Sequence, residues 1–223
     1  MKLKNVLIVV SDIERSKAFY KNLFGPDVVL DNDGNLIEVG TPMGGVTMEE
    51  IRLVKPSMKY DKDIMLFREE IIEAHDHNTF AGCYGLEQCS TAEEWMNILD
   101  QMIDPDTCPE GLVTSDTYMA VRVSDDRIVG ITEIRHHINH PILGLWGGHI
   151  GYSIRPSERR KGYAKEMLRL NLQKCKDRNM DKVMITCDRD NIASEKAILA
   201  NGGIFEKEVL GDGEYMKRYW IDL

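Results

Sequence analysis

The residues with the clearest chemical potential lie in one stretch, residues 150–164. A β-rich run there ends at Pro156, and a basic segment then leads to Gly162 and Ala164 at the predicted start of a helix. Small residues let a ligand approach the backbone, and the first N–H groups of a helix lack internal partners and carry the positive end of its dipole. The stretch therefore predicts a site for a pyrophosphate-like anion. Neither a GKS/T ending nor a GxGxxG motif is present, which excludes two better-known phosphate loops.

The spacing Arg159-x-x-Gly162-x-Ala164 resembles Q/R-x-x-G-x-G/A, the acyl-CoA signature of the GNAT N-acetyltransferase superfamily. The surroundings strengthen the resemblance, because a strand and a proline come before the motif and an amphipathic helix follows it. A later strand leads into Asn191-Ile192-Ala193-Ser194, and the next helix ends in Asn201-Gly202-Gly203, which also look like this superfamily. The resemblance covers about residues 49–223 and implies acetyl-CoA as the acyl-donor cosubstrate.

The resemblance assigns the cosubstrate to particular residues. It implies that backbone amides from Arg159 to Ala164 hold the pyrophosphate, that a strand edge pairs with the pantetheine arm, and that polar side chains contact its other end. Asn191 has an alternative role as a helix N-cap, for which asparagine is well suited. The expected cosubstrate-binding residues are Ser153, Ile154, Arg159, Arg160, Lys161, Gly162, Tyr163, Ala164, Asn191 and Ser194.

The catalytic residues are less well defined by the resemblance. Many superfamily members place a tyrosine seven residues after the asparagine, as the acid for the leaving thiolate, but this position is Ile198 here. Either another acid serves, such as Tyr152, Tyr163 or Tyr215, or the thiolate leaves without one. Glu133 and His149, on neighbouring predicted strands, are the candidate bases for the attacking amine, directly or through water. The expected catalytic residues are therefore His149, Glu133 and Tyr152.

The elements that must position these residues follow from hydrophobic periodicity. Helical spacing predicts helices over 56–75, after a capping box at Ser90–Glu93, after Pro156, and over 192–201. Short β-rich runs predict strands at 51–54, 118–123, 127–137, 148–154, 183–187, 204–210 and 214–221. The expected fold class is α+β, a GNAT fold with a mixed, mostly antiparallel central sheet flanked by helices.

Residues 1–47 have a different sequence pattern from the rest of the chain. They predict a strand at 3–10, a helix at 13–24, a hairpin with strands at 28–30 and 36–39, and a breaker-rich linker at 40–45. Residues 6–25 resemble the opening of a glyoxalase-type (vicinal oxygen chelate) module, although Asn5 stands where such modules often have a metal-binding histidine. We therefore expect a glyoxalase-like remnant at 1–47, with a small βαββ arrangement, and a GNAT domain at 48–223.

Composition restricts the class of protein and its partners. The 223 residues are 43% hydrophobic and 29% charged, with a net charge of -9, five scattered cysteines and no apolar run long enough for a membrane span. Residues 49–116 carry 16 acidic and 5 basic side chains, a balance of -11, whereas residues 155–178 carry nine basic and three acidic ones. An acidic protein with one basic helix is a poor nucleic-acid binder. We expect a cytoplasmic protein with reduced thiols, no nucleic-acid or membrane partner and no metal.

The leading hypothesis is an enzyme that transfers an acetyl group from acetyl-CoA to a primary amine by direct attack in a ternary complex. The acceptor is expected to be a small amine or an amine of a peptide or protein, and a homodimer is left open. The alternative is a non-catalytic acyl-CoA-binding sensor, which the missing tyrosine at Ile198 would suit. A third hypothesis, a metal-dependent dioxygenase or lyase, would rest on the N-terminal segment.

Overall fold

The structure is a computed structural model, and it describes residues 28–30, 37–39, 48–75 and 80–223. The chain divides into two compact units, Met1–Thr47 and Met48–Leu223. In the first unit, β1 (Val28–Leu30) and β2 (Ile37–Val39) pair antiparallel, which confirms the predicted hairpin. The strand predicted at 3–10, the helix at 13–24 and the linker at 40–45 lie outside the described residues.

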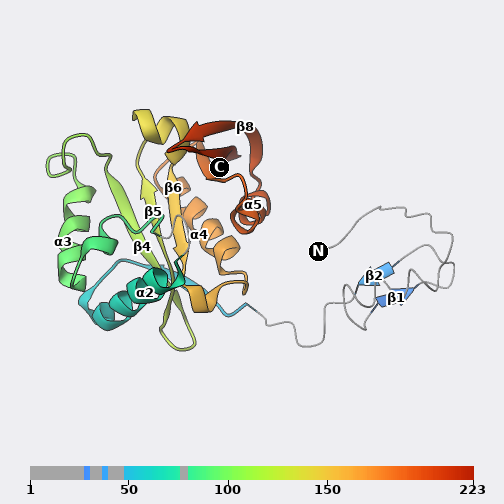
Figure 1. Cartoon of the computed structure of the whole chain (residues 1–223), viewed down its shortest axis with the longest axis horizontal. Coiled ribbons are helices and arrows are strands. Elements are labelled where there is room, and N and C mark those ends of the chain that lie inside the picture. Colours follow the sequence, from blue (N-terminus) through green and yellow to red (C-terminus); the bar gives the residue numbers. More distant parts are fainter. Residues whose placement is uncertain (1–27, 31–36, 40–47, 76–79) are drawn as a thin grey trace. The chain divides into compact units, whose positions relative to one another are not determined.

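The second unit contains a four-stranded antiparallel sheet with the order β3-β4-β5-β6 (Figure 1). Its strands confirm the predicted meander and the short strand before it. They are β3 (Ile51–Val54), β4 (Ser115–Arg122), β5 (Ile128–Arg135) and β6 (Ile150–Ile154). The register places Glu133 of β5 opposite Gly151 of β6, so both residues belong to the same face of the sheet.

A second sheet has the order β7-β9-β8, with β7 (Lys182–Asp188), β8 (Ile204–Gly211) and β9 (Glu214–Asp222). The strands β6 and β7 are edge strands of different sheets. The two sheets are joined at one end by the backbone N–H of His149, which donates to the carbonyl of Met184 at 2.8 Å. This architecture confirms the α+β prediction of antiparallel strands flanked by helices.

One face of the first sheet is covered by α2 (Asp61–Ala74), α3 (Ala92–Ile103) and residues 80–91 before α3, which include the short η2 (Leu86–Gln88). Another short turn, η1 (Met58–Tyr60), leads into α2. Helical spacing places four apolar residues on the inner side of α3; Trp95, Leu99 and Met102 are buried, and Ile98 is partly buried. The predicted cap of α3 was placed one residue too early. Thr91, and not Ser90, is the N-cap, and it forms the capping box with Glu94, because its hydroxyl reaches the Glu94 N–H at 3.2 Å.

The opposite face is covered by α4 (Tyr163–Asp177), which also packs against the second sheet together with α5 (Ile192–Leu199). Helical spacing in the sequence after Pro156 predicts an apolar stripe on α4, and all of its residues are buried: Tyr163, Met167, Leu168, Leu172 and Cys175. The remaining face of the second sheet carries η3 (Leu143–Gly147), a π-turn whose Trp146 carbonyl accepts from the Thr186 hydroxyl at 2.6 Å. The helix α4 thus links both sheets in one core.

Candidate cofactor loop and active site

The 159–162 loop, which lies between η4 (Pro156–Glu158) and α4, has an unusual backbone. Arg160 and Gly162 both have left-handed conformations, with φ of 65° and 91°. Gly162 is the N-cap of α4, so it precedes the helix, and Ala164 lies in the first turn. The first backbone bond of the helix start is the one from the Glu166 N–H to the Gly162 carbonyl, at 3.3 Å.

The groups available to bind a ligand here are the six backbone N–H groups of residues 160–165, which belong to the loop and to the first turn of α4. Within the part of the chain that the structure describes, none of them donates to a protein acceptor. Unpaired N–H groups at a helix N-terminus, reinforced by the helix dipole, form a ready site for an anion such as a phosphate. Gly162 is exposed, and a Cβ there would make an ordinary contact with the Met48 sulfur at 3.4 Å, so the positive φ, and not crowding by the protein, is what favours glycine at this position.

The sequence suggested that the basic side chains of the loop are available to a ligand, but some of them bond within the protein. Lys161 donates to the Glu158 carboxylate at 2.8 Å, so its charge is already paired, whereas Arg160 is exposed. The Arg159 Nε donates to the Ile154 carbonyl at 3.3 Å, at the end of β6. Tyr163 is buried, and its hydroxyl lies 3.4 Å from the Arg122 guanidinium.

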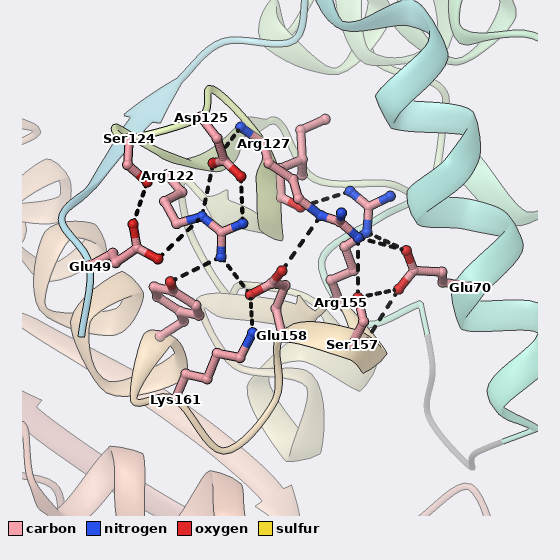
Figure 2. Close-up of polar contacts among 12 residues, drawn as sticks. Glu49, Glu70, Arg122, Ser124, Asp125, Arg127, Arg155, Ser157, Glu158 and Lys161 are labelled. Atoms are coloured by element: carbon pink, nitrogen blue, oxygen red, sulfur yellow. Dashed lines mark hydrogen bonds and ion pairs between the residues drawn. The ribbon is translucent and has the colours of Figure 1, made fainter. Parts of the chain in front are cut away.

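A network of charged side chains, which includes the buried Glu158 and Arg122, contacts the loop through Lys161, as Figure 2 shows. Glu158 is 4% exposed and accepts from Arg122 at 2.7 Å as well as from Lys161. Burial opposes ionisation of Glu158, but the hydrogen bonds from Lys161 and Arg122 outweigh it and hold the pKa of this carboxyl below its usual value. The sequence analysis did not single out Glu158 or Arg122, although a glutamate between two basic residues and a proline is a weak signal of pairing.

The second part of this network fastens the segment before the loop to α2. Arg155 is 1% exposed and donates to Asp63 at 2.6 Å and to Glu70 at 2.7 Å. Glu70 also accepts from the hydroxyl of Ser157 at 2.7 Å. A fully buried guanidinium requires such partners, because an unpaired buried charge is very costly. Two acidic residues of the charged 49–116 segment are therefore structural.

His149 joins the two sheets through its side chain as well as its backbone. Its Nδ1 accepts the Met184 N–H at 2.9 Å, and the ring is 8% exposed. Because Nδ1 supplies its lone pair to this bond, the neutral ring carries its proton on Nε2. Burial lowers the pKa of His149 to about 4, so the ring is neutral at pH 7. Neither nitrogen of this tautomer is available as a base, and the geometry gives His149 a structural role.

We expect His149 to make the stability of the protein depend on pH. Its folded-state pKa of about 4 lies below the ordinary value of 6.5. The stability that the neutral ring contributes is thus present above pH 6.5 and is lost as the pH falls toward 4, with about 2 kcal/mol lost by pH 5. Urea unfolding at pH 7 and pH 5 measures this, and His149→Gln, which keeps an acceptor, should lose much less. An equal loss in both proteins would contradict this prediction.

Two other predicted residues, Tyr152 and Ser194, are brought together across the junction of β6 and α5. Their hydroxyl oxygens are 2.8 Å apart. Burial raises the pKa of Tyr152 to about 12, so the phenol stays protonated and remains a potential proton donor. Asn191 accepts the Ser194 N–H at 3.0 Å and is the N-cap of α5, the role that had been its alternative. Ile198 is fully buried in the core.

Glu133 lies on the other face of the first sheet, beneath the segment between α2 and α3. Its carboxylate is buried and accepts from the Ser115 hydroxyl at 2.8 Å and from Arg135 at 2.8 Å. Ser153 of β6 belongs to the same face and donates to the Ala81 carbonyl at 2.8 Å. A carboxylate has about four lone-pair positions, so these two bonds leave Glu133 able to accept further hydrogen bonds, for example from an amine or a water.

The histidines that might suggest a metal centre are otherwise engaged. His136 bonds through Nε2 to Asp116 at 3.1 Å, and His140 bonds to the Gly111 carbonyl at 3.1 Å. Among the described residues, no group of three or more His, Cys, Asp and Glu side chains is arranged to hold a metal ion. The same residues contain no helix that is long and apolar enough to cross a membrane.

Residues 61–204 match the family described as acetyltransferase (GNAT) domain. Residues 2–27 match the bleomycin resistance protein-like N-terminal family, which agrees with the predicted glyoxalase-like segment. No curated protein matches the chain. The architecture defines a GNAT fold, and the match over more than half of the chain shows that the protein belongs to the GNAT acetyltransferase family. It is therefore an acyltransferase.

Solved structures with the same fold agree with this assignment. A GNAT-family acetyltransferase from Bordetella pertussis has a TM-score of 0.55 at 15% identity, and the match covers 78% of this chain and 96% of that one. Mycobacterium smegmatis RimJ in complex with CoA-disulfide has a TM-score of 0.57 at 16% identity, covering 79% and 83%. The ribosomal-protein-S5-alanine acetyltransferase of Vibrio fischeri has a TM-score of 0.54 at 19% identity, covering 78% and 93%. At these identities, the likeness concerns the fold.

Proposed function

We propose that the protein is an acetyl-CoA-dependent N-acetyltransferase that acetylates a primary amine by direct attack in a ternary complex. The observation that carries this proposal is the set of unpaired N–H groups at residues 160–165, located where the family signature predicts the pyrophosphate. Arg159 and Arg160 would add positive charge there, and Lys161 would act mainly through Glu158. The edge strand β6, at Ser153 and Ile154, would run beside the pantetheine arm, with Ser194 nearby.

The acid and the base of the reaction would come from opposite faces of β6. Glu133, on the face toward α2 and α3, would accept the proton of the attacking amine, directly or through a water. Tyr152, whose hydroxyl contacts Ser194 of α5, would give a proton to the thiolate as the C–S bond breaks. The C–N bond forms on the acetyl carbon, and the proton lost by nitrogen and the proton gained by sulfur balance. We assign the base to Glu133 because the Nδ1 lone pair of His149 is occupied.

The acceptor is proposed to be a cationic small amine, a lysine or an N-terminal amine. Residues 49–116 carry the balance of -11, and α2 and α3 lie on the face where Glu133 is found. Asp63, Glu70 and Asp116 are committed to ion pairs within the protein, so the exposed acids of α2 and α3, such as Glu69 and Glu93, would supply the attraction for the acceptor.

The proposed location is the cytoplasm. All five cysteines are free thiols, which suits a reducing cytoplasm.

The test is calorimetric binding of CoA together with thiol release from acetyl-CoA in the presence of single amines and short peptides. The enzyme hypothesis predicts amine-dependent thiol release, fastest with cationic acceptors at low salt. Tight binding of acetyl-CoA with no turnover across the panel would favour the sensor alternative instead. Absence of CoA binding would refute the proposed function.

We predict that Tyr152→Phe lowers kcat by about tenfold to 100-fold while changing the affinity for CoA by less than about twofold. The substitution removes the proton donor but keeps the ring that fills the core between β6 and α4. Ser194→Ala is the matched control, because it removes the partner hydroxyl and leaves the phenol in place. If the variant has the same kcat as the parent, and if its kcat depends on the pKa of the leaving thiol as it does in the parent, then Tyr152 is not the acid.

A further inference from the structure

The conformation of the 159–162 loop requires a support that its own sequence does not supply. Arg160 is not a glycine, yet its φ is 65°, and such a residue persists in a left-handed conformation only when its surroundings impose it. Among the described contacts, two side chains of the loop bond elsewhere in the protein. One is the bond from Arg159 to the Ile154 carbonyl, and the shorter one is the bond from Lys161 to Glu158, at 2.8 Å.

The second support is well anchored. Glu158 is buried and bonds to Arg122 of β4, which in turn is held by Asp125 through two bonds of 2.8 and 2.6 Å (Figure 2). The Arg122 guanidinium also lies 3.4 Å from the hydroxyl of Tyr163, the first residue of α4. A continuous path of polar contacts thus connects strand β4 to Lys161, which stands between the two left-handed residues.

Glu158 has two conceivable effects on an anion at this loop, and they have opposite signs. As a negative charge, it would repel the anion and neutralise Lys161, so removing it would strengthen binding. As an anchor, it would keep the N–H groups of residues 160–162 directed outward, so removing it would weaken binding. The anchor effect should dominate, because Glu158 already lies among three cations, Arg122, Lys161 and Arg127.

We propose that Glu158 is a positioning residue for the pyrophosphate of acetyl-CoA, acting through its bond to Lys161. This role of Glu158 rests on the proposed function. It adds that one buried carboxylate holds the loop in the conformation that binds the pyrophosphate. It also changes the role of Lys161, whose ammonium group would hold the loop in place and would not primarily contact the ligand.

Glu158→Gln should weaken CoA binding about tenfold by calorimetry. The KM for S-acetylpantetheine, which has no pyrophosphate, should change less than about twofold, because the defect is confined to the loop. Glu166→Gln is the matched control for charge. Glu166 lies in the first turn of α4 and pairs with Arg169, so its replacement removes one negative charge without touching Lys161. It should leave CoA binding unchanged or slightly tighter.

A double-mutant cycle separates anchoring from direct contact. If Lys161 acts through Glu158, then Lys161→Gln and Glu158→Gln together should cost no more than either alone. Should Glu158→Gln fail to fold, Lys161→Gln alone remains informative, because the NMR order parameters of the backbone N–H groups of residues 160–162 in the free protein should fall when the support is lost. Unchanged order parameters there, or CoA binding to Glu158→Gln at parental affinity or tighter, would overturn the proposal. A parent protein that binds no CoA would instead refute the proposed function itself, and the inference with it.

Discussion

Gly162→Val should lower the affinity for CoA by at least about 100-fold, because it changes both the shape and the accessibility of the loop. Gly162 has a φ of 91°, a conformation that a β-branched residue rarely adopts. The added methyl groups would also stand where phosphate oxygens must approach the backbone, whereas the new Cβ itself would make only an ordinary contact with Met48, at 3.4 Å. Isothermal titration with CoA measures the loss directly.

The same substitution should cost the fold about 1–3 kcal/mol through backbone strain. Helix propensity alone would favour valine over glycine by a few tenths of a kcal/mol, but it does not apply here, because Gly162 is the N-cap and not a helical residue. Gly111→Val is the matched control, since Gly111 has a φ of 82° and open space around it. It should lose similar stability and bind CoA normally. Parental CoA affinity in Gly162→Val would refute the assignment of the loop.

Glu133→Gln should lower kcat by about 100-fold, with CoA affinity unchanged, because an amide cannot accept the proton of the attacking amine. The variant keeps an oxygen for the Ser115 hydroxyl but loses the ion pair with Arg135, so a moderate loss of stability should accompany the loss of rate. Steady-state kinetics with a saturating cationic acceptor, at several pH values, provide the measurement.

Two controls make the Glu133 result specific. Ser115→Ala removes one hydrogen bond to the carboxylate and leaves the base in place, so kcat should fall by less than about tenfold. His149→Gln preserves an acceptor for the Met184 N–H and should retain most of the activity. The opposite pattern, an active Glu133→Gln protein and an inactive His149→Gln protein, would return the role of base to the histidine.

Local sequence signals predicted the elements well where a single segment decides its own structure. The stripe of α4 repeats at helical spacing, and all five of its predicted residues are buried. The breakers at Gly202 and Gly203 predicted the end of α5, which the structure places at Leu199. The cap of α3 was misplaced because Ser90 and Thr91 both have a glutamate three residues later, and only the backbone geometry at Thr91 selects between them.

The signature around Arg159 and Gly162 was sufficient to predict the family, because a helix start with unpaired N–H groups is a local feature that sequence spacing specifies. The state of the charged side chains was not predictable in this way. Lys161 appeared to be a free cation until its pairing with the buried Glu158 was visible, and Glu158 is buried only because Arg122 reaches it from β4, 36 residues away.

The sequence by itself thus determined the secondary structure of the second unit, its fold class and the loop that would bind the pyrophosphate. The tertiary structure decided which of the candidate groups remain available as an acid, a base or a free charge. It committed the Nδ1 of His149 to Met184, 35 residues away, and joined Tyr152 to Ser194 across two elements. The physical reason is that a proton acceptor or a charge is defined by its partners, and these partners are distant in the sequence and close only in the folded chain.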